Sequence, residues 1–223
     1  MNADQWLFFV AGNWPQGPVG GLLANLLLFL GGLAGGWLIA VPLALVRLAA
    51  PSPFRWAVGL VVEAVRSTPL LLLVFWMHFL LPLISNEGPN PWWSAIFALL
   101  IHAAAYQTEI LRAGFGSVSP NEVEAALATG MSRFQSAIYV VIPQGSRRIL
   151  PSWFSFAVSL LKDTAVVYVI GVVDLMQAGL IAAERHPNQM LFYYLLVGTG
   201  FFIVGLLLTG VGHRIERQTQ VVS

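Results

Sequence analysis

Three polar residues stand together inside one of the most apolar parts of the chain: Lys162, Asp163 and Thr164. Ionisable groups at membrane depth are costly, and they usually face a bundle interior or a water-filled path. Lys162 lies about ten residues beyond Trp153, so at about 1.5 Å per residue it lies near the midplane of a bilayer. These side chains could bind the carboxylate and ammonium of a zwitterion, or they could pair with other spans and lock the bundle.

A second ionisable pair, Glu63 and Arg66, lies in another apolar run. The two residues are three apart, so they share one helix face. Thr68 and Pro69 follow at a place where a membrane helix commonly bends or opens. Direct contact with a solute is one interpretation, and an ion pair beside a kink is the other. A pairing of Glu63 or Arg66 with Lys162 or Asp163 is the corresponding structural alternative for the first cluster.

The rest of the chain supplies helices that position these side chains in a membrane. Of its 223 residues, 57% are hydrophobic and 9% are charged, against roughly a quarter charged in a soluble domain. A run of about 20 apolar residues spans the hydrocarbon core as a helix. We expect one all-α integral membrane domain over residues 1–223, with about five spans at residues 20–45, 56–83, 92–111, 153–175 and 190–211.

Arginine is distributed unequally between the connecting segments. The segments expected inside hold Arg47, Arg55, Arg112, Arg133, Arg147, Arg148, Arg214 and Arg217, whereas those expected outside hold only Arg185. Basic residues favour the cytoplasmic side. The sequence therefore predicts an outer N-terminus and a cytoplasmic C-terminus, and it places the polar segment 112–152 in the cytoplasm. Glu109 and Arg112, at the start of that segment, are expected to reach the interface or to brace the loop.

The segment 112–152 carries two helix-start signals. Ser119 with Glu122 three residues later predicts a capping box, with Pro120 at the first helical position. The helix is expected to reach Thr129 and to stop at Gly130, which accepts a left-handed conformation. A second capping box, formed by Ser132 and Gln135, predicts a short helix from Arg133 to about Val141, ending before Pro143.

This helix, turn and helix unit has the composition of a docking surface. Ala125 and Ala126 are small enough for another surface to approach the backbone closely, and Leu127, Met131 and Phe134 offer apolar anchors. A solvated connector between two spans is the simpler alternative. Two capping boxes in sequence favour the docking unit, because a plain connector does not need them.

Four stretches resemble one family of transport proteins. Glu124-Ala125-Ala126, Gly130 and the Val140-x-Ile142-Pro143 run resemble the EAA loop of the membrane subunits of bacterial binding-protein-dependent ABC importers. The stretches VRSTPLLLLVF (65–75), AYQTEILRAGFGSVSPNEVEAA (105–126) and LLKDTAVVYVIGVVDL (160–175) are similar to signatures of the polar amino acid permeases. Ser67 stands where glycine is usual, and Val-x-Ile-Pro replaces the usual Ile-x-Leu-Pro.

The resemblance implies a type I importer permease that moves a polar amino acid by alternating access. In such importers the loop lies as a coupling helix in a groove of a separate ATPase subunit, so Glu124 would contact the ATPase or brace the loop, and Ala125, Ala126 and Gly130 would permit a close fit. The implied partners are two ATPase subunits, a second permease subunit, identical or homologous, an extracytoplasmic substrate-binding protein, the amino acid and membrane lipid. ATP and Mg²⁺ would be bound by the ATPase, and the location would be the bacterial cytoplasmic membrane.

Several other function classes lack support in the sequence. A phosphate-binding P-loop needs Gly-Lys-Ser/Thr, but the lone lysine, Lys162, follows Leu161, so any ATPase must be another chain. The chain has no cysteine, a net charge of +1 and no histidine–carboxylate cluster with metal spacing, so thiolate metal sites, nucleic-acid binding and enzymatic activity are not expected. His78 and His102 are interpreted as packing residues. A secondary transporter or channel remains the alternative, although it would not need a capped docking unit.

Overall fold

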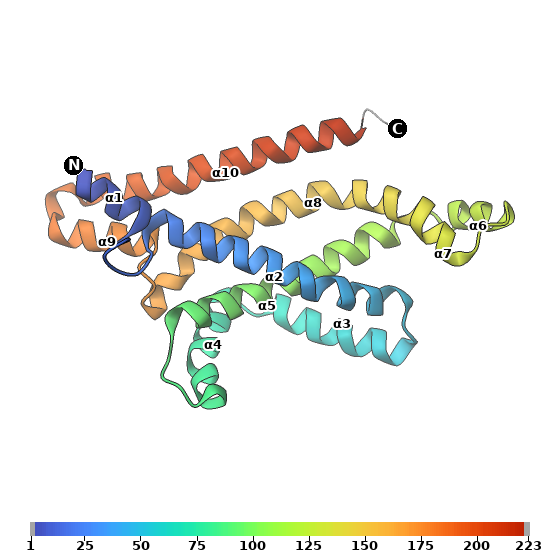
Figure 1. The fold of residues 1–223 in the computed structure, drawn as a ribbon, viewed down its shortest axis with the longest axis horizontal. Coiled ribbons are helices and arrows are strands. Elements are labelled where there is room, and N and C mark those ends of the chain that lie inside the picture. The colour runs from blue at the N-terminus through green and yellow to red at the C-terminus, as the bar shows by residue number, and fades with distance from the viewer. Residues whose placement is uncertain (1–2, 221–223) are drawn as a thin grey trace.

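The computed structural model describes residues 3–220, and within that range it is built from helices without a β-strand. The expected all-α fold is confirmed for these residues, while residues 1–2 and 221–223 of the expected domain lie outside them. Figure 1 shows the long helices running side by side along the molecule. They are α2 (Gly21–Ala49), α5 (Pro91–Gly116), α8 (Ile142–Asp163) and α10 (Met190–Gln220).

Shorter elements close the two ends of the bundle (Figure 1). One end carries α6 (Pro120–Ala128), α7 (Arg133–Ser136) and a π-helical turn (Ala137–Val141). The opposite end carries α1 (Ala3–Ala11), a 3₁₀ segment (Thr164–Ile170), α9 (Leu175–Arg185) and a short 3₁₀ turn (Pro187–Gln189).

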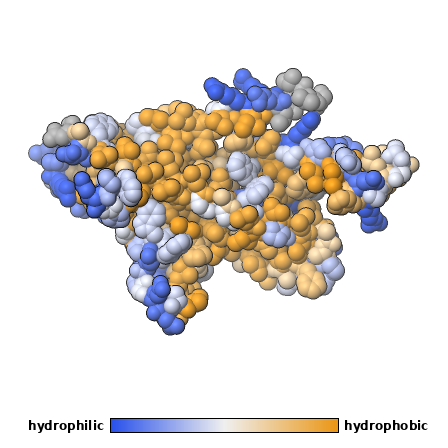
Figure 2. All heavy atoms as spheres, in the orientation of Figure 1, coloured by the Kyte–Doolittle hydropathy of each residue, from blue (hydrophilic) through white to orange (hydrophobic). Residues whose placement is uncertain are grey.

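Four described helices are long and apolar enough to cross a membrane, namely Gly21–Ala49, Pro91–Gly116, Arg133–Ile170 and Pro187–Gln218. A fifth crossing results if α3 (Ser52–Ser67) and α4 (Leu70–Ser85) count as one broken span. The expectation of about five spans therefore agrees with the structure. On the face shown in Figure 2, hydrophobic side chains cover the middle of the molecule and hydrophilic ones gather at its extremities.

Two expected spans differ in shape from the helices that form. The span expected at 56–83 is bent by 104° between α3 and α4, at Thr68 and Pro69. Pro69 cannot donate a backbone hydrogen bond, and the residue before a proline avoids the helical conformation. The span expected at 153–175 instead belongs to a helix that ends at Ile170, because Gly171 has φ +91° and a left-handed backbone. Residues 171–174 therefore lie outside it.

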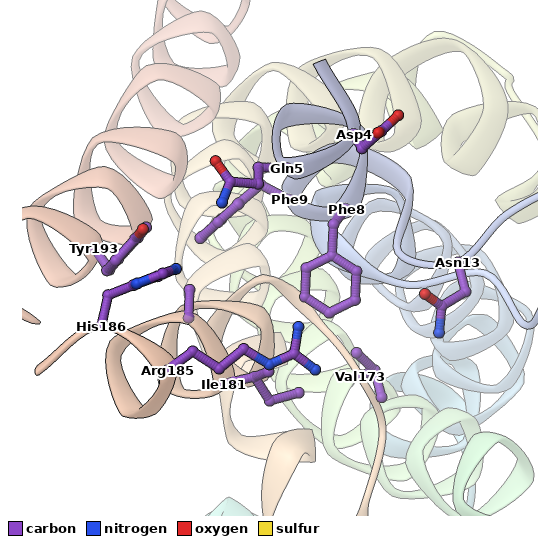
Figure 3. A pocket seen from close by; sticks show the side chains of 11 residues that line it. Asp4, Gln5, Phe8, Phe9, Asn13, Val173, Ile181, Arg185, His186 and Tyr193 are labelled. Atoms are coloured by element: carbon purple, nitrogen blue, oxygen red, sulfur yellow. The ribbon is translucent and has the colours of Figure 1, made fainter. Parts of the chain in front are cut away.

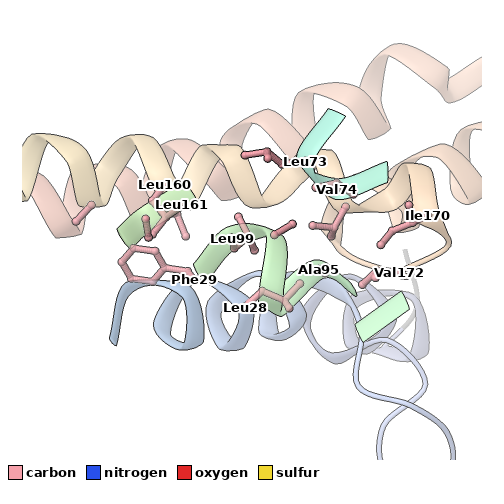
Figure 4. Close-up of a cluster of buried hydrophobic side chains, with 14 of the residues drawn as sticks. Leu28, Phe29, Leu73, Val74, Ala95, Leu99, Leu160, Leu161, Ile170 and Val172 are labelled. Atoms are coloured by element: carbon pink, nitrogen blue, oxygen red, sulfur yellow. The ribbon is translucent and has the colours of Figure 1, made fainter. Parts of the chain in front are cut away.

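The core lies where α2, α5 and α8 meet α4 (Figure 4). Leu28, Leu99, Leu160 and Leu161 are fully buried there. Along α2, small residues recur every four positions, at Gly32, Gly36, Ala40 and Ala44. Small side chains let membrane helices approach closely, and packing then replaces the hydrophobic effect as the source of association. The α2–α5 contact is thus the most extensive helix contact within residues 3–220, and α3 and α8 pack against both helices.

Gly36→Val is expected to lower the melting temperature of the permease by about 4–10 °C, equivalent to roughly 2–3 kcal/mol of overpacking. A Cβ atom at Gly36 would lie 2.7 Å from the Cβ of Ala103 and 2.9 Å from the backbone nitrogen of Ala104. Gly31→Val in the same helix is the matched control, because a Cβ there meets no atom within 4 Å. Equal melting temperatures for the two variants would contradict the close α2–α5 contact.

Candidate functional site

A cavity of about 640 Å³ opens beside the break between α3 and α4, and we call it the mid-membrane cavity. Three elements line it. The break contributes Arg66 to Leu70, α5 contributes His102, Tyr106 and Ile110, and α8 contributes Ser155, Phe156, Ser159 and Asp163. A cation and an anion predicted from the sequence thus line one cavity, although they are 97 positions apart in the chain (163 minus 66).

Arg66 is held in place from two sides. Its Nη1 donates to the Glu63 carboxylate at 3.1 Å, and its guanidinium lies 5.3 Å from the centroid of the Tyr106 ring. The Tyr106 hydroxyl donates to the Arg66 carbonyl at 3.4 Å. Glu63 itself is not a lining residue, and its side chain is 66% exposed. Arg66 therefore faces the cavity, while Glu63 serves as its partner from the same helix.

Asp163 has a histidine as its nearest ionisable neighbour from another helix. Its Oδ2 lies 3.8 Å from His102 Nε2, and the His102 ring packs against Tyr106 at 4.7 Å between centroids. Tyr106 in turn stacks on Phe156 at 5.5 Å. The interpretation of His102 as a packing residue is therefore incomplete, because its ring both packs and approaches Asp163. The cross-pairs of Lys162 or Asp163 with Glu63 or Arg66 do not form among the described residues.

Lys162 points to a different surface of α8. It lines a second cavity of about 290 Å³ between α8 and α10, together with Thr209, His213 and Glu216. Ser155 and Ser159 line both cavities, so the two spaces flank one polar face of α8. Lys162 and Asp163 consequently face different neighbours, although they are adjacent in the sequence.

Thr164 does not line the mid-membrane cavity, and its expected place on a solute path stays a prediction. It is fully buried with Asn25 and Asp174. Asn25 Nδ2 donates to Thr164 Oγ1 and to Asp174 Oδ2, both at 3.0 Å, and the Leu175 N–H donates to Asn25 Oδ1 at 2.9 Å. This buried polar cluster joins α2 to the start of the 3₁₀ segment, through Thr164, and to the N-terminus of α9, through Asp174. Thr164 therefore contributes to the packing of the bundle.

Asp174 also caps α9, because its Oδ1 accepts from the Gln177 N–H at 2.9 Å. Burial raises the pKa of the Asp174 carboxyl to about 6, and hydrogen bonds from the backbone and Asn25 pull it partly back down. Each oxygen of this buried carboxyl thus has a donor. The arrangement depends on Asn25, the single polar residue in the first half of the α2 sequence.

Sequence reasoning did not assign to a site several polar and aromatic residues that line the mid-membrane cavity. They are His102, Tyr106, Ser155, Phe156 and Ser159. A signal for two of them is present in the sequence, since Ser155, Ser159 and Asp163 recur every four residues on one helix face. The aromatic residues carry no such signal, because rings at helical spacing usually belong to a core.

The expected docking unit forms a capped lobe at one end of the bundle. Ser119 caps α6, but its hydroxyl accepts from the Asn121 N–H, and the structure of residues 3–220 lacks the reciprocal bond from the Ser119 N–H to the Glu122 carboxylate. The first predicted capping box is therefore wrong. The second is correct: Ser132 Oγ accepts from the Gln135 N–H at 3.2 Å, and Gln135 Oε1 accepts from the Ser132 N–H at 2.8 Å.

Gly130 ends α6 in a Schellman motif. The Met131 N–H donates to the Ala126 carbonyl at 3.3 Å, and the Gly130 N–H donates to the Leu127 carbonyl at 3.0 Å. Gly130 has φ +89°, a backbone conformation that side-chain-bearing residues rarely adopt. The glycine is thus required by the turn.

Pro143 does not end the second helix of the lobe. A π-helical turn, Ala137–Val141, joins α7 to α8, and the helix continues through Pro143. The extra residue per turn shifts the hydrogen-bond pattern, as in the Ile142 N–H that donates to the Ala137 carbonyl. Pro143 has no N–H to donate, and it directly follows the point where the π-helical turn interrupts the regular hydrogen-bond pattern.

The lobe presents small and apolar groups at its surface. Glu124 and Ala125 are exposed, whereas Ala126 is buried within the lobe. Phe134 is 74% exposed, and Met131 also belongs to the exposed large hydrophobic residues. Glu124 has no hydrogen bond or ion pair within residues 3–220. It points outward, so bracing of the loop by Glu124 is not seen in the described part of the chain.

Another ionic cluster connects α2 and α5 near their C-terminal ends. Glu109 pairs with Arg112 in its own helix, through a 2.8 Å bond from Arg112 Nε. Arg47 Nη2 lies 3.3 Å from the other Glu109 oxygen, and Arg47 Nη1 donates to the Arg55 carbonyl. Glu109 and Arg112 thus pair with each other and with Arg47 of α2, and the expected bracing of the loop stays a prediction.

A further cavity of about 430 Å³ lies at the end opposite the lobe, between α1, α9 and the start of α10 (Figure 3). Tyr193 stacks against Phe9 at 6.0 Å on one side and against His186 at 6.1 Å on the other. The Arg185 side chain extends toward Phe8 (Figure 3). This aromatic stack packs the N-terminal helix against α10.

Within residues 3–220, no three His, Asp or Glu side chains are grouped to hold a metal ion.

Comparison with known proteins identifies a common set of relatives. A family described as "Binding-protein-dependent transport system inner membrane component" matches residues 22–220. The L-cystine transport system permease protein TcyB of Bacillus subtilis is 33% identical over 183 residues, which cover 82% of this chain and 78% of that protein. The glutamate/aspartate import permease protein GltK of Escherichia coli is 30% identical over 206 residues, covering 89% and 92%.

A solved structure has the same fold. A chain from the crystal structure of an amino acid ABC transporter with histidines superposes with a TM-score of 0.81 at 28% identity. The match covers 89% of this chain and 92% of that one.

Proposed function

This chain belongs to the family of binding-protein-dependent transport system inner membrane components, and from that premise we propose that an amino acid crosses it along the cavity between Arg66 and Asp163. It is a multi-pass permease subunit of an amino acid ABC importer in the inner membrane. Its relatives include permeases named for cystine and for glutamate and aspartate. The particular amino acid is left open by these differing names.

The placement of Arg66 and Asp163 on separate walls of one cavity carries the proposal. A zwitterion needs a cation for its carboxylate and an anion for its ammonium. Charged groups at membrane depth normally face a solute path or a partner. Thr68, Ser155 and Ser159 add hydroxyl groups on the same walls, so a polar solute can exchange hydrogen bonds as it moves. The break at Thr68 and Pro69 supplies backbone groups that a continuous helix would use internally.

The exposed lobe is proposed as the site where a separate ATPase subunit docks. Phe134 and Met131 would bury their apolar surface against it, and Glu124 would meet a basic or polar group. Exposed apolar groups on a capped, well-defined lobe fit a protein interface. Two ATPase subunits would bind ATP and Mg²⁺, and their closure would move the lobe and hence α5 and α8.

The remaining assembly follows from the same proposal. The lobe faces the cytoplasm, and the end formed by α1 and α9 faces outward, where a substrate-binding protein delivers the amino acid. A second permease subunit, identical or homologous, would cover the open side of the cavity. Uptake driven by an ion gradient without any ATPase subunit would contradict this assignment.

Asp163→Asn is expected to reduce ATP-dependent amino acid uptake about tenfold, because the neutral amide no longer attracts the ammonium group. Lys162→Gln should have a smaller effect, since Lys162 faces the groove beside α10. Uptake of labelled L-glutamine, L-glutamate and L-arginine into proteoliposomes measures the change. Glu87→Gln in the exposed 86–90 loop is the control. Wild-type uptake by Asp163→Asn, with normal assembly, would remove Asp163 from the path.

A further inference from the structure

A fourth cavity, of about 350 Å³, lies between the mid-membrane cavity and the base of the lobe. It shares Arg66, Tyr106 and Ile110 with the mid-membrane cavity. Its far wall is formed by Gly114, Ser117, Arg148 and Ser152. The two spaces are therefore neighbours, with Arg66 at their junction and Arg148 at the lobe side.

Arg148 closes the base of the lobe. Its Nη1 donates to the Ser117 carbonyl, and the Ser117 hydroxyl lies 3.3 Å from the same nitrogen. These residues are 31 positions apart and bracket the lobe. Beside this clamp, α5 and α8 cross without spare room, since a Cβ on Gly114 would lie 2.2 Å from Ile149 Cγ1. Movement of the Arg148 side chain would therefore change how the two ends of the lobe segment are held together.

The charge of Arg148 is not balanced by another side chain within residues 3–220. The carboxylate that lines the same cavity is Glu109, and it is already paired with Arg112 and Arg47. Only Nη1 of Arg148 makes a hydrogen bond there, which leaves Nε and Nη2 for a ligand. Two donors on one side of a guanidinium match the geometry of a carboxylate.

We propose that this fourth cavity is a cytoplasmic exit site, in which Arg148 binds the α-carboxylate of the amino acid that has crossed the membrane. The inference rests on the proposed path, because it extends that path from Arg66 to the lobe. A carboxylate on Nε and Nη2 leaves the Nη1 clamp to Ser117 intact. The clamp holds the guanidinium in the cavity wall, so the ligand binds the clamped arrangement in preference to an unclamped one and shifts the population toward it. Amino acid accumulated in the cytoplasm would then slow further import.

The test uses the permease with its ATPase subunits and binding protein in proteoliposomes that enclose ATP. The probe is whichever of L-glutamine, L-glutamate and L-arginine gives the fastest uptake into vesicles that enclose ATP but no amino acid. Preloading the lumen with about 10 mM of the unlabelled amino acid, enough to fill a weak millimolar site, is expected to slow initial uptake about fivefold. The α-carboxamide of the same amino acid should not slow it, because it lacks the α-carboxylate.

Arg148→Ala is expected to make uptake insensitive to the preloaded amino acid. Arg147→Ala is the matched control, since Arg147 is exposed as Arg148 is but does not line the cavity. Arg148→Lys should restore part of the inhibition, because a lysine keeps the charge but loses the paired donors. If Arg148→Ala stops uptake, ATP hydrolysis by the complex in nanodiscs replaces it as the readout, again with and without amino acid.

The failures of the two proposals are distinguishable. The proposed function would be contradicted if the wild-type complex took up none of the probes into vesicles that enclose ATP but no amino acid. Normal uptake that preloading does not slow, or that preloading slows equally in wild type and Arg148→Ala, would overturn the exit site alone. Inhibition by the α-carboxamide would also overturn it, because the ligand would then bind without its α-carboxylate.

Discussion

Gly130→Pro is expected to lower ATP-driven uptake about 100-fold while the protein still inserts into the membrane, because a strain of roughly 3 kcal/mol must be relieved by moving the lobe. Proline fixes φ near −65°, whereas Gly130 has φ +89°. Proline also removes the N–H that donates to the Leu127 carbonyl. The Schellman turn cannot form, and the exposed surfaces of α6 and α7 lose their relative positions. Uptake into proteoliposomes and the ATPase activity of the complex measure the uncoupling.

Gly130→Asn is the control for this change, because asparagine tolerates the left-handed conformation better than other residues with a side chain. A Cβ at this position meets no atom within 4 Å, so steric conflict does not complicate the comparison. The asparagine variant should keep a large part of the uptake. Wild-type uptake by Gly130→Pro would mean that the lobe geometry does not transmit the ATPase movement.

The parts of the fold that the sequence could predict are those set by local composition. Apolar runs locate membrane helices, since about 20 apolar residues must lie in lipid wherever they occur. The start and the turn of the lobe follow from Ser119, Gly130 and Ser132, whose effects act within a few residues. The bend at Pro69 could be expected for the same reason, but its angle of 104° could not. That angle depends on how α4 packs against α5.

Long-range placement explains most of what the sequence did not reveal. Adjacent residues such as Lys162 and Asp163 look alike in a sequence, yet they face α10 and α5 respectively. Thr164 follows them directly and is buried, because α8 becomes a 3₁₀ segment there and turns the side chain toward α2. Arg148 and Ser117 come together only when α5 and α8 cross. Each of these assignments needs the packing of two distant helices.

Asn25→Leu is expected to lower the melting temperature by about 6–12 °C, corresponding to roughly 3 kcal/mol, because it leaves buried polar groups without partners. The substitution keeps the branching of the side-chain heavy atoms, but leucine is bulkier, and it removes both donors and the acceptor at this position. Asp174 Oδ2 loses a bond in a fully buried site, and the Leu175 N–H loses its acceptor. Tryptophan fluorescence of the detergent-purified permease follows the transition, since the chain contains eight tryptophans.

Thr164→Val distinguishes loss of the buried polar cluster from a general sensitivity of this region. Valine has the shape of threonine, and Asn25 keeps its bonds to Asp174 and to Leu175 in that variant. The expected fall in melting temperature is therefore clearly smaller than for Asn25→Leu. If both variants melt at the wild-type temperature, the cluster does not hold α2 to the start of α9. If Thr164→Val instead abolishes uptake without changing stability, Thr164 belongs to the solute path after all.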